Sequence, residues 1–148
     1  MRTALIVLAV LSAGAAIAAD SPYSQEARGI ALVVPDDGKR LPLCNHPSLF
    51  TTIANRFHYK ESGYWNSSAR LTSFEEPVEL GYRPWGPEFI PRRFCRTRAM
   101  ASGGTLHDVF YSVGYQTGTL GVVHGVTWCV DGFDRNLAYA PGCKMAGP

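Results

Sequence analysis

One short segment holds four arginines, three of which would share a face of a strand, a pattern whose side chains could bind anions. Residues 92–98 read Arg-Arg-Phe-Cys-Arg-Thr-Arg. Alternate side chains of an extended strand share a face, so this segment predicts a surface, here called the arginine face, formed by Arg92, Phe94, Arg96 and Arg98. Guanidinium groups bind carboxylates and phosphates through paired hydrogen bonds. The pattern predicts a binding surface for a small anionic ligand, a lipid headgroup or an acidic protein.

The same arginines have a second interpretation, in which the chain neutralises them itself. Acidic residues stand in the neighbouring segments, at Glu75, Glu76, Glu79 and Asp108. If these carboxylates pair with the guanidinium groups, the surface needs no external anion. Only a surface that binds anions predicts that sulfate or phosphate raises the melting temperature far more than chloride at equal ionic strength.

A histidine and a tyrosine form the second candidate site. A turn centred near residue 117 would place His124 opposite Tyr111 on the apolar side of a sheet. A buried histidine beside a tyrosine can serve general acid–base catalysis. The alternative is a core histidine bonded to the tyrosine or to backbone, and no acidic residue falls on that face. No catalytic residue is assigned, and His124 and Tyr111 are kept only as candidates.

Four cysteines, at positions 44, 95, 129 and 143, predict two disulfides in an exported chain. The expected strand register puts Cys95 and Cys129 on opposite faces, whereas a disulfide needs Cα atoms within about 7 Å. Cys44 precedes the helix that should cover Cys95, and Cys129 leads into the tail that carries Cys143. We therefore expect Cys44–Cys95 and Cys129–Cys143. The thiols form no close pairs and the histidines have no ligand spacing, so no metal site is expected.

One helix and several strands must position these groups. Helical spacing of apolar residues predicts a helix over 47–61. Strands are predicted over 68–82 (bent or broken at Pro77), 92–100, 106–113 and 120–130. The order predicts an α+β fold, a helix packed on an antiparallel sheet of three to five strands and stapled by disulfides. This outline is similar to that of the cystatins and of the nuclear-transport-factor-like cone folds.

The turns set the expected register. A turn centred near 103 pairs Arg98 with Asp108, and the turn near 117 pairs Val109 with Val126. One face of the sheet is then largely apolar and should pack on the helix. It consists of Cys95, Thr97, Ala99, Val109, Tyr111, Val113, Val122, His124, Val126, Trp128 and Val130.

The first nineteen residues predict export. Arg2 precedes an apolar run over 4–11, and Ala16-Ile17-Ala18 fits a signal-peptidase site. We predict a signal peptide over 1–19 and a single domain over 20–148, with a loose lead-in over 20–29 and a loop-rich tail over 131–148. This chain would be periplasmic or extracellular, and no later stretch predicts a transmembrane segment.

Charge excludes one class of partner. The chain carries a formal net charge of +2, and removal of Arg2 with the leader leaves +1. Nucleic acid is therefore not expected as a partner. The expected partner is an unknown protein or a small anionic ligand.

Three functions remain open from the sequence. The leading prediction is an exported, non-enzymatic binding module that needs no cofactor. One alternative is a small cone-fold enzyme or ligand carrier that uses His124 and Tyr111 in a pocket. Another is an accessory subunit of an envelope complex. An open polar pocket reaching His124 would favour the second, and a closed apolar interior with an exposed aromatic–arginine patch would favour the first.

Overall fold

One long helix and four strands form most of what a computed structural model describes, which is residues 41–84, 90–121 and 123–148. All of these residues belong to one compact unit, Val33–Pro148. The predicted signal peptide, the lead-in and Val122 lie outside the described residues. No helix among those described is long and apolar enough to cross a membrane.

Helix α2, Pro47–Trp65, buries one stripe of side chains. The stripe recurs every fourth residue and consists of Leu49, Ile53, Phe57 and Glu61. The helix continues four residues past the predicted end at 61 and includes Gly63. It ends where Asn66 adopts a left-handed conformation (φ 49°) and its N–H donates to the Glu61 carbonyl. A capped end outweighs the roughly 1 kcal/mol that an interior glycine costs.

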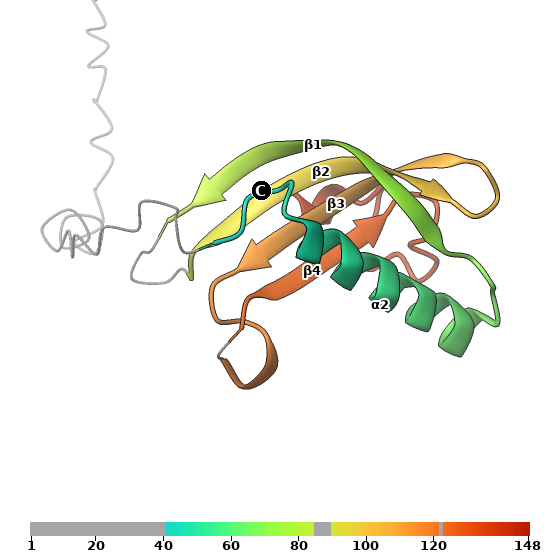
Figure 1. Cartoon of the computed structure of the whole chain (residues 1–148), viewed down its shortest axis with the longest axis horizontal. Helices are drawn as coiled ribbons and strands as arrows, with labels where there is room; N and C mark the ends of the chain where they lie inside the picture. The colour runs from blue at the N-terminus through green and yellow to red at the C-terminus, as the bar shows by residue number, and fades with distance from the viewer. Residues whose placement is uncertain (1–40, 85–89, 122) are drawn as a thin grey trace, which may run out of the picture. The chain divides into compact units, whose positions relative to one another are not determined.

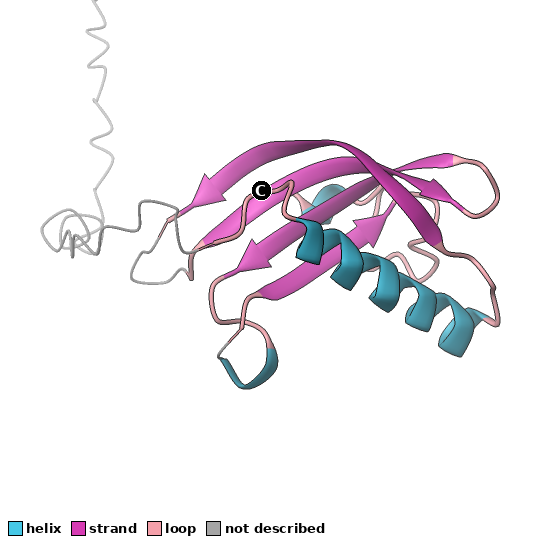
Figure 2. Cartoon of the chain, viewed as in Figure 1, coloured by secondary structure: helices cyan, strands magenta, loops and turns pink. Residues whose placement is uncertain are grey.

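The four strands form one antiparallel sheet in sequence order (Figure 1). They are β1 (Leu71–Arg83), β2 (Arg92–Ala101), β3 (Leu106–Gly114) and β4 (Gly125–Val130). Coloured by secondary structure, the helix lies across one face of this sheet (Figure 2). The predicted α+β class, with one helix on an antiparallel sheet, is confirmed.

Strand β1 crosses Pro77 without breaking into two. Its pairing with β2 skips between Glu75 and Val78, and Glu76 has a φ of 50°. A proline is tolerated here because β1 lies at the sheet edge and the bulge removes the need for its missing N–H.

The first predicted hairpin register is confirmed and the second is wrong. Arg98 pairs with Asp108 as expected. Val109, however, pairs with Val130 instead of Val126, because β4 begins at Gly125 and not at residue 120. Residues 119–121 instead form a 3₁₀ turn in which Leu120 takes a positive φ of 57°. The apolar composition after residue 119 suggested a strand, but the loop between β3 and β4 extends to residue 124.

The error of four residues leaves the faces unchanged, because strand side chains alternate with a period of two. The apolar face packs on α2 as predicted, and we call it the helix face. Its fully buried members are Cys95, Thr97, Ala99, Val109, Tyr111, Val113 and Val130. The Phe50 ring of α2 stacks on Phe74 of β1 at 4.7 Å between centroids.

The opposite face, here called the tail face, is partly covered by residues 131–148. A small cluster forms there from Cys129, Cys143 and Ala146, with Phe110 and Tyr139 packed against it. The end of the tail reaches β1, since a Cβ on Gly81 would lie 3.6 Å from Pro148. The predicted loop-rich tail thus serves as a second covering layer.

Two disulfides hold these layers to the sheet. Cys44–Cys95 ties the segment before α2 to β2, and Cys129–Cys143 ties the tail to β4. Their Cα separations are 5.8 and 5.7 Å. These are the two pairs that the sequence favoured. Two disulfides indicate an oxidising compartment.

Candidate functional site

The arginine face lies on the tail face of β2. Arginine side chains lie over two aromatic rings on this side of the sheet. The Arg96 guanidinium lies 6.0 Å from the centre of the Phe110 ring. The Arg83 guanidinium lies 5.5 Å from that of Phe94. Flat guanidinium groups stack well on aromatic rings. Arginines and aromatic rings thus alternate across the strands of this face.

Acidic side chains from both flanking strands pair with the exposed arginines. Two nitrogens of Arg96 donate to Asp108 Oδ1, at 3.2 and 2.9 Å. Arg98 Nη2 lies 2.8 Å from Glu76 and 3.7 Å from Glu75. The internal neutralisation that the sequence offered as an alternative is present for both arginines.

These ion pairs are open to solvent. The side chains of Arg96 and Arg98 are 47% and 40% exposed. Exposed pairs contribute only about 0–1 kcal/mol each, so a competing anion replaces such a partner at small cost. Both arginines line a hollow of about 80 Å³ beside the β1 bulge, with Glu76, Val78 and Thr97 as its other lining residues.

Only part of the arginine face is open to solvent. Phe94 and Ser112 are buried, at 6% and 3% exposure, and the Arg83 guanidinium lies over the Phe94 ring. The Arg92 side chain is partly buried and its Nη1 lies 3.5 Å from Ser112 Oγ. Arg96 and Arg98 therefore form the open part of the predicted surface, whereas Phe94 does not present its ring to solvent.

Arg93 points to the other face and is nearly buried. Its guanidinium pairs with Glu79 and lies 5.4 Å from the Tyr82 ring. Only 8% of the Arg93 side chain is exposed. This arginine holds the end of β1 onto β2 and is separate from the arginine face.

The second candidate site is not assembled. Tyr111 pairs with Trp128, and His124 lies before the start of β4, with its ring 6.0 Å from Tyr115. Tyr111 is fully buried and its hydroxyl donates to the Cys44 carbonyl at 2.6 Å. Burial raises the pKa of Tyr111 above its usual value. The expected His124–Tyr111 pairing is wrong because it depended on the β4 register.

An ion pair between a buried glutamate and a partly exposed arginine joins α2 to the tail, and it was not among the predicted sites. Glu61 is fully buried, and its Oε2 accepts a hydrogen bond from Arg135 Nη2 at 2.7 Å. The Arg135 guanidinium also lies 5.3 Å from the Trp65 ring and 5.9 Å from that of Phe133. The available signal was Glu61's position in the four-residue repeat of buried helix residues.

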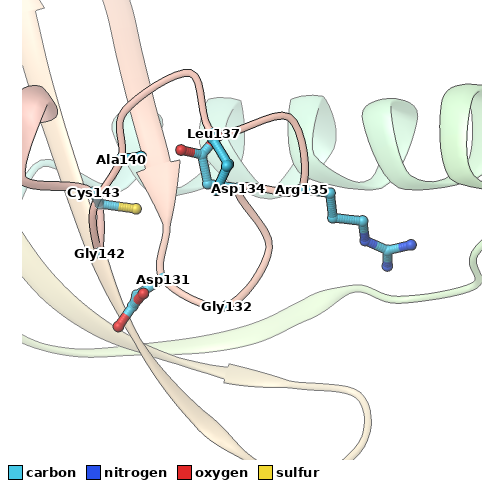
Figure 3. Close-up of a pocket in the computed structure, with 8 residues that line it drawn as sticks. All are labelled: Asp131, Gly132, Asp134, Arg135, Leu137, Ala140, Gly142 and Cys143. Carbon is cyan, nitrogen blue, oxygen red and sulfur yellow. The ribbon is translucent and has the colours of Figure 1, made fainter.

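The larger hollow, of about 280 Å³, lies within the tail (Figure 3). It is lined by Asp131, Gly132, Asp134, Arg135, Leu137, Ala140, Gly142 and Cys143. Figure 3 shows Arg135 extending away from the other side chains. The Asp134 carboxylate already accepts the N–H groups of Ala138 and Tyr139, at 3.1 and 2.7 Å. Asp134 thus orders the tail loop.

Another histidine, His107, has structural partners. His107 bonds to Thr105 Oγ1 and to the Asp131 carbonyl, at 2.8 and 2.9 Å. Across residues 41–84, 90–121 and 123–148, no group of three or more His, Cys, Asp or Glu side chains is placed to hold a metal ion. No protein-family model, curated protein or solved structure matches this chain.

Proposed function

We propose that this chain is a small, exported, non-enzymatic binding module that meets its partner through its outer surface. The closed interior carries the proposal. Ile53, Phe57 and Tyr111 are each 0% exposed between α2 and the sheet. Neither of the two hollows described above includes a residue of α2. A filled interior supports surface recognition better than pocket chemistry.

The open part of the arginine face is the proposed contact. Arg96 and Arg98 border one hollow, and their present partners are carboxylates in solvent-exposed pairs. A carboxylate or phosphate of a ligand would take the place of Asp108 or Glu76 through the same guanidinium geometry. The ligand class we propose is therefore anionic, either a small acid or an acidic group on a protein.

Export has two supports of different kinds. The predicted signal peptide over 1–19 and the two disulfides both fit a periplasmic or extracellular location. The pocket enzyme loses its main support because Tyr111 is enclosed and apart from His124. An accessory role in an envelope complex stays a prediction with no surface assigned to it.

Thermal unfolding in sulfate and in chloride tests the arginine contact. At equal ionic strength and about ten times the sulfate dissociation constant, we expect sulfate to raise the melting temperature by about 3–5 °C over chloride. The double variant R96Q/R98Q should lose this difference.

The matched control is R70Q, which removes an exposed arginine outside the arginine face. It should keep the full sulfate effect. Equal melting temperatures in the two salts, or an unchanged difference in R96Q/R98Q, would overturn the proposed contact.

A further inference from the structure

The outer edge of β4 carries backbone groups that face away from its neighbour. Within the described residues only β3 pairs with this strand. The Val126 carbonyl accepts from Arg56 Nη1 and the Val130 carbonyl from the Phe133 N–H, both at 3.0 Å. Backbone groups point to the same edge at every second residue, so those of Trp128 also face outward. This edge offers hydrogen bonds to another strand.

The two edges of the sheet differ in how they resist such pairing. Strand β1 has three register irregularities, a proline and the acidic residues Glu75, Glu76 and Glu79. Strand β4, whose sequence is Gly-Val-Thr-Trp-Cys-Val, pairs with β3 without a register shift and has no charged residue. Bulges, proline and charge protect an edge, and β4 has none of them.

Two cations of α2 border this edge. Arg56 reaches Val126, and Lys60 Nζ lies 5.6 Å from the centre of the Trp128 ring. Neither forms an ion pair with a carboxylate in the part of the chain that the structure describes. Glu61, next in sequence, is buried and engaged by Arg135. Among the described residues, therefore, no carboxylate pairs with the cations at the β4 edge, in contrast to the arginine face.

We infer that the β4 edge, formed by Arg56, Lys60, Val126 and Trp128, binds an extended acidic segment of a partner protein as an added strand. Backbone hydrogen bonds to Trp128 would hold the segment. Every second side chain of that segment would point toward α2, where carboxylates meet Arg56 and Lys60. The charge selects an acidic partner over a basic one.

This inference is independent of the arginine face, because the two surfaces share no residue. Arg56 would exchange its bond to the Val126 carbonyl for one to a peptide carboxylate, which frees that carbonyl for a peptide N–H. Arg56 is exposed, so this rearrangement requires no change in the core.

Hydrogen exchange with a designed peptide tests it. The probe is a ten-residue peptide of alternating glutamate and valine, added to the oxidised protein. Binding should slow exchange of the Trp128 amide, because that N–H becomes hydrogen-bonded. Replacing both cations, in R56Q/K60Q, should weaken the peptide affinity roughly tenfold.

Three controls keep the outcome specific. The variant R96Q/R98Q should bind the peptide as tightly as the parent protein, even if the sulfate experiment fails. A peptide N-methylated at alternate residues should lose binding, because it cannot pair as a strand. A lysine–valine peptide should bind far more weakly than the acidic one. The melting temperature of R56Q/K60Q verifies that this variant folds.

Three results would overturn the inference. One is unchanged peptide affinity in R56Q/K60Q. Another is unaltered Trp128 exchange in the peptide-bound protein. The third is a Trp128 amide that is already protected before peptide is added, which would mean that another part of this chain or a second copy occupies the edge. If that protection increases with protein concentration, a second copy occupies the edge. If it does not, another part of this chain does.

Discussion

On the helix face, α2 lays Leu49, Ile53 and Phe57 against a continuous apolar layer of the sheet. On the tail face, the covering segment contributes only Cys143, Ala146 and the partly buried Tyr139. The first cover is held by packing along a whole helix, and the second by one disulfide and a few contacts. The same sheet therefore has a packed side, which sets stability, and a sparse side, which leaves polar groups open for binding.

The largest difference in stability between the helix face and the tail face is expected when one aromatic ring is removed from each. Phe57→Ala should lower the free energy of unfolding by about 3–5 kcal/mol, because Phe57 is fully buried and contacts Trp128 and Phe133. Tyr139→Ala on the tail face should cost only roughly 1 kcal/mol. Denaturant unfolding of both variants measures the gap, and similar losses would show that the tail face packs as firmly as the helix face.

The two disulfides should differ in the same direction. Cys44–Cys95 spans 51 residues and Cys129–Cys143 spans 14. Loop-closure entropy then predicts a stabilisation of about 4 kcal/mol for the first and about 3 kcal/mol for the second. Equilibrium unfolding of the two double cysteine-to-serine variants measures the free energy of unfolding that each disulfide contributes. A larger loss at Cys129–Cys143 would contradict it.

The Glu61–Arg135 ion pair links α2 to the tail. Arg135→Ala should cost about 2 kcal/mol, because it leaves the Glu61 carboxylate buried without its cation. R70A, an exposed arginine, should change stability by about 0.5 kcal/mol or less. If replacing Glu61 by leucine in the Arg135→Ala background restores stability, the cost arises from the unpaired charge. No recovery would assign it to lost packing on Trp65 and Phe133.

The smallest effect is expected at the arginine face. Arg96→Ala should change the free energy of unfolding by less than about 1 kcal/mol, because its pair with Asp108 is exposed. Thermal unfolding of R96A and D108A checks this. A loss of several kcal/mol at either residue would mean that the arginine face supports the fold, which would weaken the case for binding there.

The sequence predicted the parts of the fold that depend on local pattern. Apolar spacing located α2, and the short turn after β2 was enough to pair Arg98 with Asp108. The register across the longer loop between β3 and β4 could not be predicted from a turn in this way. Its residues after 119 resemble a strand in composition, yet the pairing of Trp128 with Tyr111 excludes them from the sheet.

In the candidate sites too, features that depend on local pattern were predictable and features that depend on distant contacts were not. The side on which each arginine lies was predictable from strand alternation, as were the acids available to pair with them. That Phe94 would be buried was not predictable, because its burial depends on side chains of other segments, such as Arg83. Nothing local specifies where residues 131–148 pack either. The Glu61–Arg135 pair joins positions 74 residues apart and depends on that same packing.

Composition and periodicity by themselves determined the class of fold, the faces of the sheet and the cysteines that can meet, because these depend on side-chain alternation and on short connections. Only the tertiary structure decided which arginines stay open, where His124 lies and that Arg56 and Lys60 border the edge of β4. Those outcomes depend on contacts between distant segments, whose geometry the whole packed chain sets and no local pattern encodes.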